Sequence, residues 1–378
     1  MRLTREQEAF ATAIRDFAAK ECGTVAQRDA LTDSGREADS PHLLAKVAAL
    51  GWLGVSLPTE FGGPGGSFVD ECIFLEESAR GLLPIQAYGT GLTAAQTYLR
   101  YGTDAQAQTI VESICAGRFE AIALSEPGAG SDLGAVQCKG VRTADGWRID
   151  GQKTWNTAGH LADHILVLTR TDSSGPKHEG LTLLMVDAGT PGLTVRPIET
   201  MDAHVVNDLF FDGVEVPAGA VVGEIGKGWR HLMRGLSVER LIIAAMALGG
   251  AQRALDDVIA FTTQRQAFGR TVSSFQAVRH RIADLATEVA FCRSFVYDTA
   301  ARIDDGEEGN LATEGSMAKL KCTEVAKAAT LEALQLMGGY GYSREYGVEG
   351  QVRRALAQPI YGGTNEIQRD IIAKNLGL

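Results

Sequence analysis

Apolar residues recur three and four positions apart over both ends of the chain, which is the spacing of amphipathic helices. In the first 120 residues, glycine-rich or polar loops such as residues 61–66 separate the helical segments. Ser40 directly precedes Pro41, so we expect it to cap a helix. The helices predicted here cover residues 6–22, 40–50, 69–81 and 104–116.

From about residue 121 the pattern changes to short runs of Val, Ile, Leu and Thr with turn residues between them, which predicts strands at 147–151, 165–169 and 181–186. Helical spacing returns over residues 229–263, 274–304, 310–337 and 363–376. The predicted fold class is α+β, with a helical N-terminal domain (1–120), a middle β-domain (121–225) and a C-terminal helical bundle domain (226–378). A catalytic site is expected where the helical and β-domains meet.

Composition narrows the possible functions. The 378 residues are 45% hydrophobic and carry a net charge of −11, which is typical of a globular protein and argues against binding to nucleic acid or anionic lipid. Six scattered cysteines without a CxxC motif indicate neither a disulfide framework nor a zinc site. His160 and His164 have helical spacing but are expected in a turn that enters a strand, so no metal site is predicted.

The longest uninterrupted apolar run, residues 241–251, is too short to cross a bilayer. Glu6 and Glu8 lie where a signal peptide needs its apolar core. No membrane span is therefore predicted, and a cytoplasmic location is expected.

Two segments of the middle region offer candidate ligand contacts. Residues 125–134 combine small residues with the hydroxyls of Ser125 and Ser131, and their glycine spacing differs from the dinucleotide fingerprint. In the following strand, Trp155 and Thr157 share one face, where they can hold a planar ring such as a flavin. Taken alone, the first segment also fits an ordinary turn and Trp155 also fits a core position.

A charged pair precedes the most apolar helix of the chain. Glu239 and Arg240 stand directly before residues 241–246, which are apolar on every side of a helix. Buried charges are costly unless they are paired or used. A structural ion pair is one interpretation; the other is a general base, because loss of water raises the pKa of a Glu toward neutrality.

Three further segments place amides, Arg and glycine turns at helix ends, where anions bind. They are residues 265–276, 335–342 and 361–369. Each segment alone is equally typical of a helix cap.

In this order, the segments resemble the acyl-CoA dehydrogenase family from about residue 3 to the C-terminus. The resemblance rests on Ser-Glu-Pro-Gly-Ala-Gly-Ser-Asp (125–132), Gly-Gln-Lys-Thr-Trp (151–155), Arg-Gln-Ala-Phe-Gly (265–269) with Gln276, Gln335 with the glycine pair 338–339, and Tyr-Gly-Gly-Thr-Asn-Glu-Ile (361–367). It implies a helical N-terminal domain, a β-barrel-like middle domain and a C-terminal four-helix bundle, assembled as a homotetramer built from two dimers. It also implies bound FAD, an acyl-CoA substrate, electron-transfer flavoprotein as partner, and a role in fatty acid β-oxidation.

The resemblance assigns residues to these ligands. Positions matching flavin or pyrophosphate contacts are Ser125, Ser131, Trp155 and Thr157; those matching ADP contacts are Arg265, Phe268 and Gln276, with Gln335 and Gly339 from a neighbouring subunit; Thr364 and Glu366 match C-terminal flavin contacts. On the substrate side the matching positions are Ser131, Arg240, Gly362 and Gly363. Asn156 departs from the Ile usual after the Trp and is expected to alter the polarity around the flavin.

The main departure from the family pattern is Gly362, because many members carry their catalytic Glu at that position. In the long-chain and isovaleryl-type subgroups a small residue fills it, and the base comes from the helix position that Glu239 occupies here. The resemblance therefore implies that Glu239 removes the α-proton of the acyl chain while the β-hydride goes to flavin N5. The product is the trans-2-enoyl-CoA.

Three alternatives remain open from the sequence. The same fold serves flavin monooxygenases or oxidases, dehydrogenases of acyl groups on an acyl carrier protein, and non-catalytic subunits of mixed tetramers. Neither the acyl chain length nor its branching is predicted.

Overall fold

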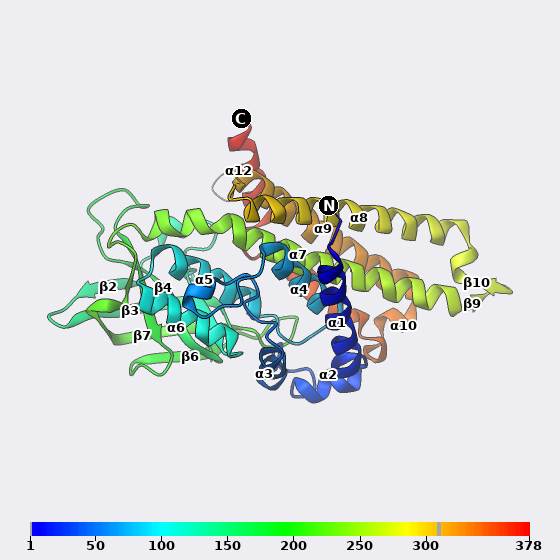
Figure 1. The fold of residues 1–378 in the computed structure, drawn as a ribbon, viewed down its shortest axis with the longest axis horizontal. Helices are drawn as coiled ribbons and strands as arrows, with labels where there is room; N and C mark the ends of the chain where they lie inside the picture. The colour runs from blue at the N-terminus through cyan, green and yellow to red at the C-terminus, as the bar shows by residue number, and fades with distance from the viewer. Residues whose placement is uncertain (1, 308–310) are drawn as a thin grey trace. The chain divides into compact units, whose positions relative to one another are not determined.

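A computed structural model describes residues 2–307 and 311–378, the side chains of residues 234–237 excepted. Its contacts divide the chain into two compact units. One contains the chain up to Gly35, Ser67–Pro84 and Ser237–Leu378; the other contains Arg36–Gly66 and Ile85–Leu236. Figure 1 shows helices and a sheet along the same chain, and the predicted α+β fold class is confirmed.

The unit from Arg36 to Leu236 contains an eight-stranded sheet within the described residues. Its hydrogen-bonded order is β6-β7-β3-β2-β4-β5-β8, and β1 adds to β4 in parallel. The longest pairing is antiparallel, between β3 and β7, and is interrupted by a register shift between Lys153 and Asn156. The strands are β1 (Phe119–Ala123), β2 (Lys139–Arg142), β3 (Gly146–Thr157), β4 (Ala162–Arg170), β5 (Leu181–Asp187), β6 (Leu193–Pro197), β7 (Val206–Pro217) and β8 (Val221–Val222).

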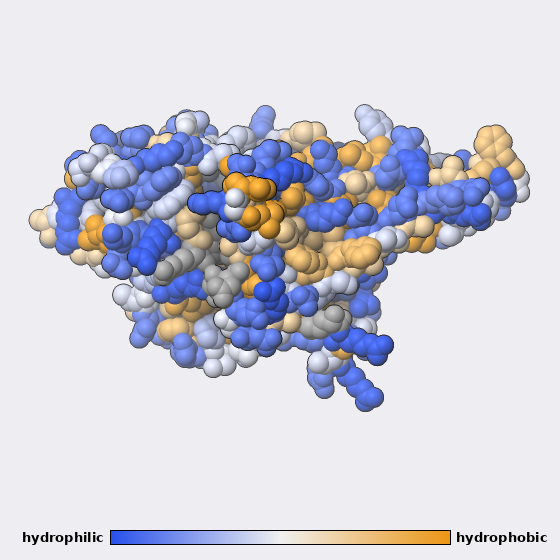
Figure 2. Space-filling view, turned by 90° about the horizontal axis from the view of Figure 1, so that it is seen from above, coloured by the Kyte–Doolittle hydropathy of each residue, from blue (hydrophilic) through white to orange (hydrophobic). Residues whose placement is uncertain are grey.

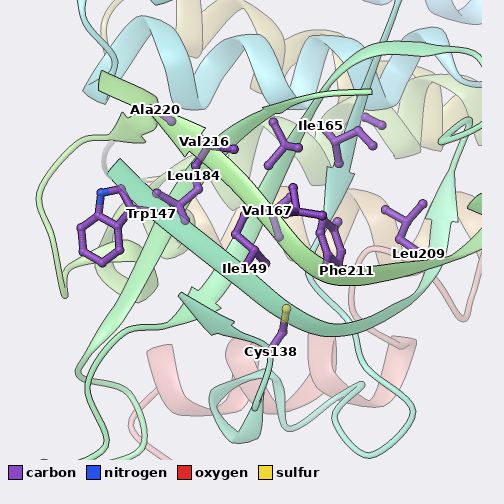
Figure 3. Close-up of a cluster of buried hydrophobic side chains, with 14 of the residues drawn as sticks. Cys138, Trp147, Ile149, Ile165, Val167, Leu184, Leu209, Phe211, Val216 and Ala220 are labelled. Carbon is purple, nitrogen blue, oxygen red and sulfur yellow. The ribbon is translucent and has the colours of Figure 1, made fainter. Parts of the chain in front are cut away.

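One face of this sheet carries a buried apolar core. Figure 3 shows side chains from several strands pointing toward one another, among them Ile149 of β3, Val167 of β4 and Phe211 of β7. In β4 and β5 the residues between these core positions are buried as well, so both faces of these strands are covered. The predicted strands at 147–151, 165–169 and 181–186 all lie within β3, β4 and β5.

Three helices belong to the same unit: α3 (Pro41–Ala49), α5 (Tyr88–Tyr101) and α6 (Asp104–Cys115). Ser40 caps α3 as predicted, because its side chain accepts a hydrogen bond from the N–H of Leu43. The sequence did not predict α5, whose first turn contains Gly89 and Gly91. Gly91 faces β1, where a Cβ would lie 3.8 Å from that of Glu120. Tertiary packing therefore forms a helix where local propensity is weak.

The other unit is helical. Its N-terminal elements are α1 (Arg5–Cys22), α2 (Val25–Leu31) and α4 (Phe68–Arg80); its C-terminal elements are α7 (Gly228–Gln264, from Ser237 onward), α8 (Gln276–Asp304), α9 (Ala312–Met337), α10 (Gly339–Tyr342), α11 (Val348–Ala357) and α12 (Asn365–Asn375). The predicted helices at 229–263, 274–304 and 363–376 agree with α7, α8 and α12 within two residues. The predicted start of α9 at residue 310 lies outside the described residues. The short helices α2, α10 and α11 were not predicted.

A buried ionic network joins α4 to α8. Glu76 of α4 accepts hydrogen bonds at Oε1 from Arg293 Nε (2.9 Å) and Nη2 (2.6 Å), and at Oε2 from the Tyr297 hydroxyl (2.8 Å). Glu76 and Tyr297 are buried, so each lost hydrogen bond leaves a charged oxygen without water.

Replacing Tyr297 with Phe is therefore expected to lower the free energy of unfolding by about 1.5–3 kcal/mol, since the lost bond is made to a charged group. Urea unfolding followed by circular dichroism measures this difference. The exposed Tyr342 supplies a control, because Y342F should stay within about 0.5 kcal/mol of wild type. Equal stability of Y297F and wild type would contradict the network's contribution.

The surface is mainly polar. Figure 2 shows hydrophilic side chains over most of one face, with several apolar patches between them. Exposed apolar residues of the helical unit include Phe268, Phe291 and Leu331. None of the described helices is long and apolar enough to cross a membrane.

Candidate active site

The carboxylate of Glu239 lies beside the backbone of Gly362. A Cβ placed on Gly362 would be 3.7 Å from Glu239 Oε1 and 2.3 Å from Ile243 Cδ1. Glu239 and Ile243 are one turn apart on α7, while Gly362 precedes α12. The side chains of α7 therefore occupy the space that a side chain at position 362 would enter.

The surroundings of Glu239 favour proton exchange. The residue is half-buried, and no described residue donates a hydrogen bond to its carboxylate. Burial raises the pKa of Glu239, while the positive charges of Arg240 and Lys319 lower it. Arg240 is buried, its Nε has no hydrogen-bond partner among the described residues, and burial lowers its pKa. No ion pair between Glu239 and Arg240 is formed, so the structural ion-pair interpretation is not supported.

Buried polar side chains hold the Gly362–Gly363 turn in place through hydrogen bonds to its carbonyls. Both glycines have positive φ, 64° and 77°, which residues with a side chain rarely adopt. Gln368 Nε2 donates to the carbonyls of Gly362 (3.1 Å) and Gly363 (2.9 Å), and Lys319 Nζ donates to that of Gly363 (2.8 Å). The N–H of Gly362 has no acceptor among the described residues.

Thr364 caps α12 as predicted, since its hydroxyl accepts a hydrogen bond from the N–H of Ile367 at 3.3 Å. Glu366 follows in the first turn with an 80% exposed side chain, and hydrogen bonds from its own backbone N–H and from Thr364 lower its pKa. The negative charge of Glu366 is favourable at this end of the helix. The two residues thus form an open helix N-terminus.

In the sheet unit, a buried ion pair fixes the segment that carries Ser125. Lys153 of β3 is fully buried and donates to the carbonyl of Leu124 (2.9 Å) and to Glu126 Oε1 (2.7 Å). The N–H of Thr154 donates to the carbonyl of Ser125 at 2.9 Å. Ser125 is therefore held directly beside the strand that carries Trp155 and Thr157.

The strand end presents Trp155 to solvent. Its side chain is 59% exposed and its φ is +59°, at the register shift between β3 and β7. Thr157 is half-buried. Asn156 points inward and is buried, and its Nδ2 donates to the carbonyl of Ile122 at 2.7 Å. This hydrogen bond ties β3 to β1.

The loop after Ser125 is open. Ser131 is exposed, and a Cβ on Gly128 or Gly130 would contact nothing within 4 Å. Asp132 is held by Lys177, whose Nζ lies 2.8 Å from Asp132 Oδ1. This loop can therefore approach a ligand closely without steric obstruction.

The remaining predicted contacts lie in the helical unit, at the hairpin of β9 (Gln266–Ala267) and β10 (Arg270–Thr271) and at the junction of α9 with α10. Phe268 at its tip is 95% exposed with φ of +53°, and its ring meets that of Phe275 edge-on. The Arg265 guanidinium lies 5.2 Å from the centre of the Tyr340 ring. Three further predicted residues, Gln276, Gln335 and Gly339, are exposed.

A His-Glu-His cluster in the sheet unit has ligand atoms close enough for a metal ion: Glu37, His160 and His204. The amide of Asn207 determines its protonation. Asn207 Nδ2 donates to the carbonyl of Asn156 (3.2 Å) and lies 3.0 Å from His160 Nδ1, to which it also donates, because an amide nitrogen does not accept hydrogen bonds. Neutral His160 then carries its proton on Nε2, which faces Glu37, and cannot offer that nitrogen to a metal.

Sequence models of three domains match this chain: the N-terminal domain of acyl-CoA dehydrogenase over residues 4–118, the middle domain over 121–214 and the C-terminal domain over 226–377. The chain belongs to the acyl-CoA dehydrogenase family. The enzyme class predicted from the sequence, an oxidoreductase acting on the CH–CH bond of an acyl-CoA, is confirmed, and so is the cofactor FAD.

Relatives within this family are named for different activities. A 3-(aryl)acrylate reductase of Clostridium sporogenes is 33% identical over the full length of both chains. The caffeyl-CoA reductase-Etf complex subunit CarC of Acetobacterium woodii is 33% identical, with 95% of each chain covered. Among solved structures, the acyl-CoA dehydrogenase from Geobacillus kaustophilus is 36% identical with a TM-score of 0.91, covering 100% of this chain and 99% of that one.

In each unit taken by itself, the residues present fit a part of FAD. An exposed indole at Trp155, hydroxyls at Ser125 and Thr157, and an open loop at Ser131 are suited to an aromatic ring and its linker. The open N-terminus of α12 and the exposed Arg265 are suited to its polar and anionic parts. FAD, when bound, accepts a hydride from the substrate.

Sequence reasoning missed Lys153 and Lys319, the two fully buried lysines of the described chain. A lysine inside a strand or helix is normally read as solvated. The available signal for Lys153 was the acidic Glu126 in the preceding motif; for Lys319 no local signal exists, because its acceptors follow it by more than 40 residues.

Proposed function

We propose that this protein is an FAD-dependent dehydrogenase that removes hydrogen from Cα and Cβ of an acyl-CoA thioester, with Glu239 as the base. The observation that carries the proposal is the position of the Glu239 carboxylate, which lies at Gly362, where many family members place their catalytic Glu. No described group competes for this carboxylate through a hydrogen bond. Glu239 can therefore replace the missing side chain without a change in the fold.

Glu239 has two tasks in this reaction. Its ionised carboxylate takes the α-proton of the acyl chain, and the partly buried environment that raises its pKa strengthens it as a base toward that weakly acidic C–H. The free N–H of Gly362 can donate to the thioester oxygen, where negative charge develops as the proton leaves. Arg240 follows Glu239 directly and orients it or approaches the CoA moiety.

The remaining predicted contacts belong to the cofactor. Ser125, Ser131, Trp155 and Thr157 would contact the flavin side, and Thr364 with Glu366 its C-terminal edge. Arg265, Phe268 and Gln276 would hold the ADP part. The exposure of Phe268 supports this role, because a fully exposed phenylalanine ring is unfavourable unless it contacts a partner.

Assembly and electron transfer follow from the same proposal. Exposed apolar residues of the helical unit, including Phe268 and Phe291, support a homotetramer in which Gln335 and Gly339 reach the cofactor of a neighbour. Electron-transfer flavoprotein is the proposed acceptor, since the similar CarC is a subunit of a reductase-Etf complex. A role in fatty acid β-oxidation and a cytoplasmic location are part of this proposal.

A second candidate is the reverse reaction, reduction of an α,β-unsaturated thioester or acid. Two relatives with 33% identity are named as reductases of aryl-acrylate and caffeyl groups. The same carboxylate would then deliver a proton to Cα instead of removing it.

The test is anaerobic mixing of the FAD-loaded protein with straight-chain, branched and aryl-substituted acyl-CoAs while the flavin absorbance is followed. Bleaching by one class is expected and identifies the substrate. Bleaching by none, with reoxidation of the chemically reduced protein by aryl-acryloyl substrates, would support the reductase. Rapid reoxidation by air with a hydroxylated product would instead indicate a monooxygenase.

A further inference from the structure

Lys319 of α9 is an isolated buried charge. Its side chain is fully buried, and its Nζ donates to the carbonyl of Gly363 (2.8 Å) and to Asn365 Oδ1 (3.0 Å). No described carboxylate forms an ion pair with it. Taking an ammonium group out of water without a counterion is unfavourable, so its presence calls for a function.

The carboxylate that raises the pKa of Lys319 most is that of the proposed base, Glu239. Lys319 holds the carbonyl of Gly363, and Glu239 Oε1 lies beside the preceding residue, Gly362. Ammonium and carboxylate thus flank the same two-residue turn, and each acts electrostatically on the other. The turn itself has positive φ at both glycines and needs external hydrogen bonds to stay in place.

Other charges also act on this pair. Arg240, next to Glu239 on α7, lowers the pKa of Glu239 more than Lys319 does, whereas Glu366 on α12 is largely exposed, so water screens it. On the facing sides of α9 and α12, Glu324 is paired with Arg369, and Lys321 of α9 with Glu288 of α8. Lys319 and Arg240 are therefore the two cations that act on Glu239.

We propose that Lys319 is a positioning residue of the dehydrogenation: it fixes the Gly362–Gly363 turn and its positive charge keeps Glu239 ionised for proton removal. This inference rests on the proposed role of Glu239. Burial lowers the pKa of Lys319 to about 8, so the ammonium form persists at pH 7. Burial raises the pKa of Glu239 and the charge of Lys319 lowers it, so removing that charge raises the pKa of Glu239 further.

Two variants separate charge from hydrogen bonding. K319Q removes the charge and keeps an amide donor, whereas K319M removes both. The rate of anaerobic flavin reduction is measured from pH 5.5 to 9 in each, with FAD content and melting temperature as checks. The exposed Lys327 on the same helix supplies the matched control K327Q.

In both variants we expect the acidic limb of the rate profile to shift to higher pH by about 0.5–1 unit. The rate then falls several-fold at pH 6 and less at pH 8. K327Q keeps the wild-type limb. If K319M does not fold, K319Q still carries the test. An unmoved acidic limb in folded, FAD-loaded K319Q overturns the inference, even if its rate is uniformly lower.

The variant Glu239→Gln, measured in parallel, separates a failure of the proposed function from a failure of the positioning role of Lys319. Flavin reduction at the wild-type rate in E239Q defeats the proposed function itself. Loss of reduction in E239Q together with an unmoved limb in K319Q defeats only the role of Lys319.

Discussion

The E239Q variant is expected to bind FAD at the wild-type level but to reduce it about 10²–10⁴-fold more slowly on addition of the preferred acyl-CoA. A general base contributes about 10²–10⁴ to such a rate, and the amide of Gln cannot accept the α-proton. No described hydrogen bond depends on the Glu239 carboxylate, so the substitution should leave the fold unchanged. Anaerobic stopped-flow absorbance at the flavin band measures the rate.

Two further variants make this result specific. E239D keeps a carboxylate but withdraws it from the Gly362 backbone, and its rate should fall between those of wild type and E239Q. E288Q removes an exposed carboxylate of α8 that pairs with Lys321 at 2.7 Å, and its rate should equal that of wild type. A fast E239Q would show that another group removes the proton.

The pH dependence in wild type follows from the same residue. Because burial raises the pKa of Glu239, its carboxylate becomes protonated at a higher pH than that of an ordinary Glu. The protonated acid cannot take a proton, so the rate should fall as the pH drops through that raised pKa. The acidic limb belongs to Glu239 if it disappears from the small residual rate of E239Q.

The second large effect is expected for stability. Lys153→Met breaks the buried ion pair with Glu126 and should lower the free energy of unfolding by about 3–5 kcal/mol, because it leaves a carboxylate uncompensated. Glu126 also accepts hydrogen bonds from the backbone N–H groups of Gln137 and Cys138, which directly precede β2. A displaced Glu126 is therefore expected to destabilise the start of β2 as well. Denaturant unfolding of the FAD-free protein gives the difference.

The matched control is K177M. Lys177 also pairs with an acidic residue, Asp132 at 2.8 Å, but both side chains are more than half exposed. Such a pair contributes about 0–1 kcal/mol. Similar destabilisation by K153M and K177M would mean that burial of the Lys153 pair is unimportant.

The sequence was sufficient for the fold class and the family because those follow from periodicity and from motifs whose residues are contiguous. Glu239 was predicted because a charge stood before an unusually apolar helix while the family's Glu was absent at Gly362. That the two positions meet in space is a tertiary fact, visible only in the 3.7 Å approach of Oε1 to the Cβ position of Gly362.

What the sequence did not predict depends on burial. A Lys at position 153 or 319 carries the same local signal whether it is solvated or fully enclosed, and only the surrounding elements decide. The helix Tyr88–Tyr101 was missed for the opposite reason, because its glycines oppose helix formation locally but allow close packing on β1. The inward hydrogen bond of Asn156 to the Ile122 carbonyl likewise depends on how β3 packs on β1.

The contact between Ile243 and the vacant side of Gly362 also constrains which residues position 362 can accept. A Glu introduced there would bring its Cβ to 2.3 Å from the Ile243 Cδ1 and strain a backbone with φ of +64°, while Glu239 still occupied the same space. The three positions are therefore epistatic. A side chain at position 362 is therefore accommodated only if the Ile243 side chain moves or becomes smaller, so the effect of a substitution at 362 depends on the residue at 243.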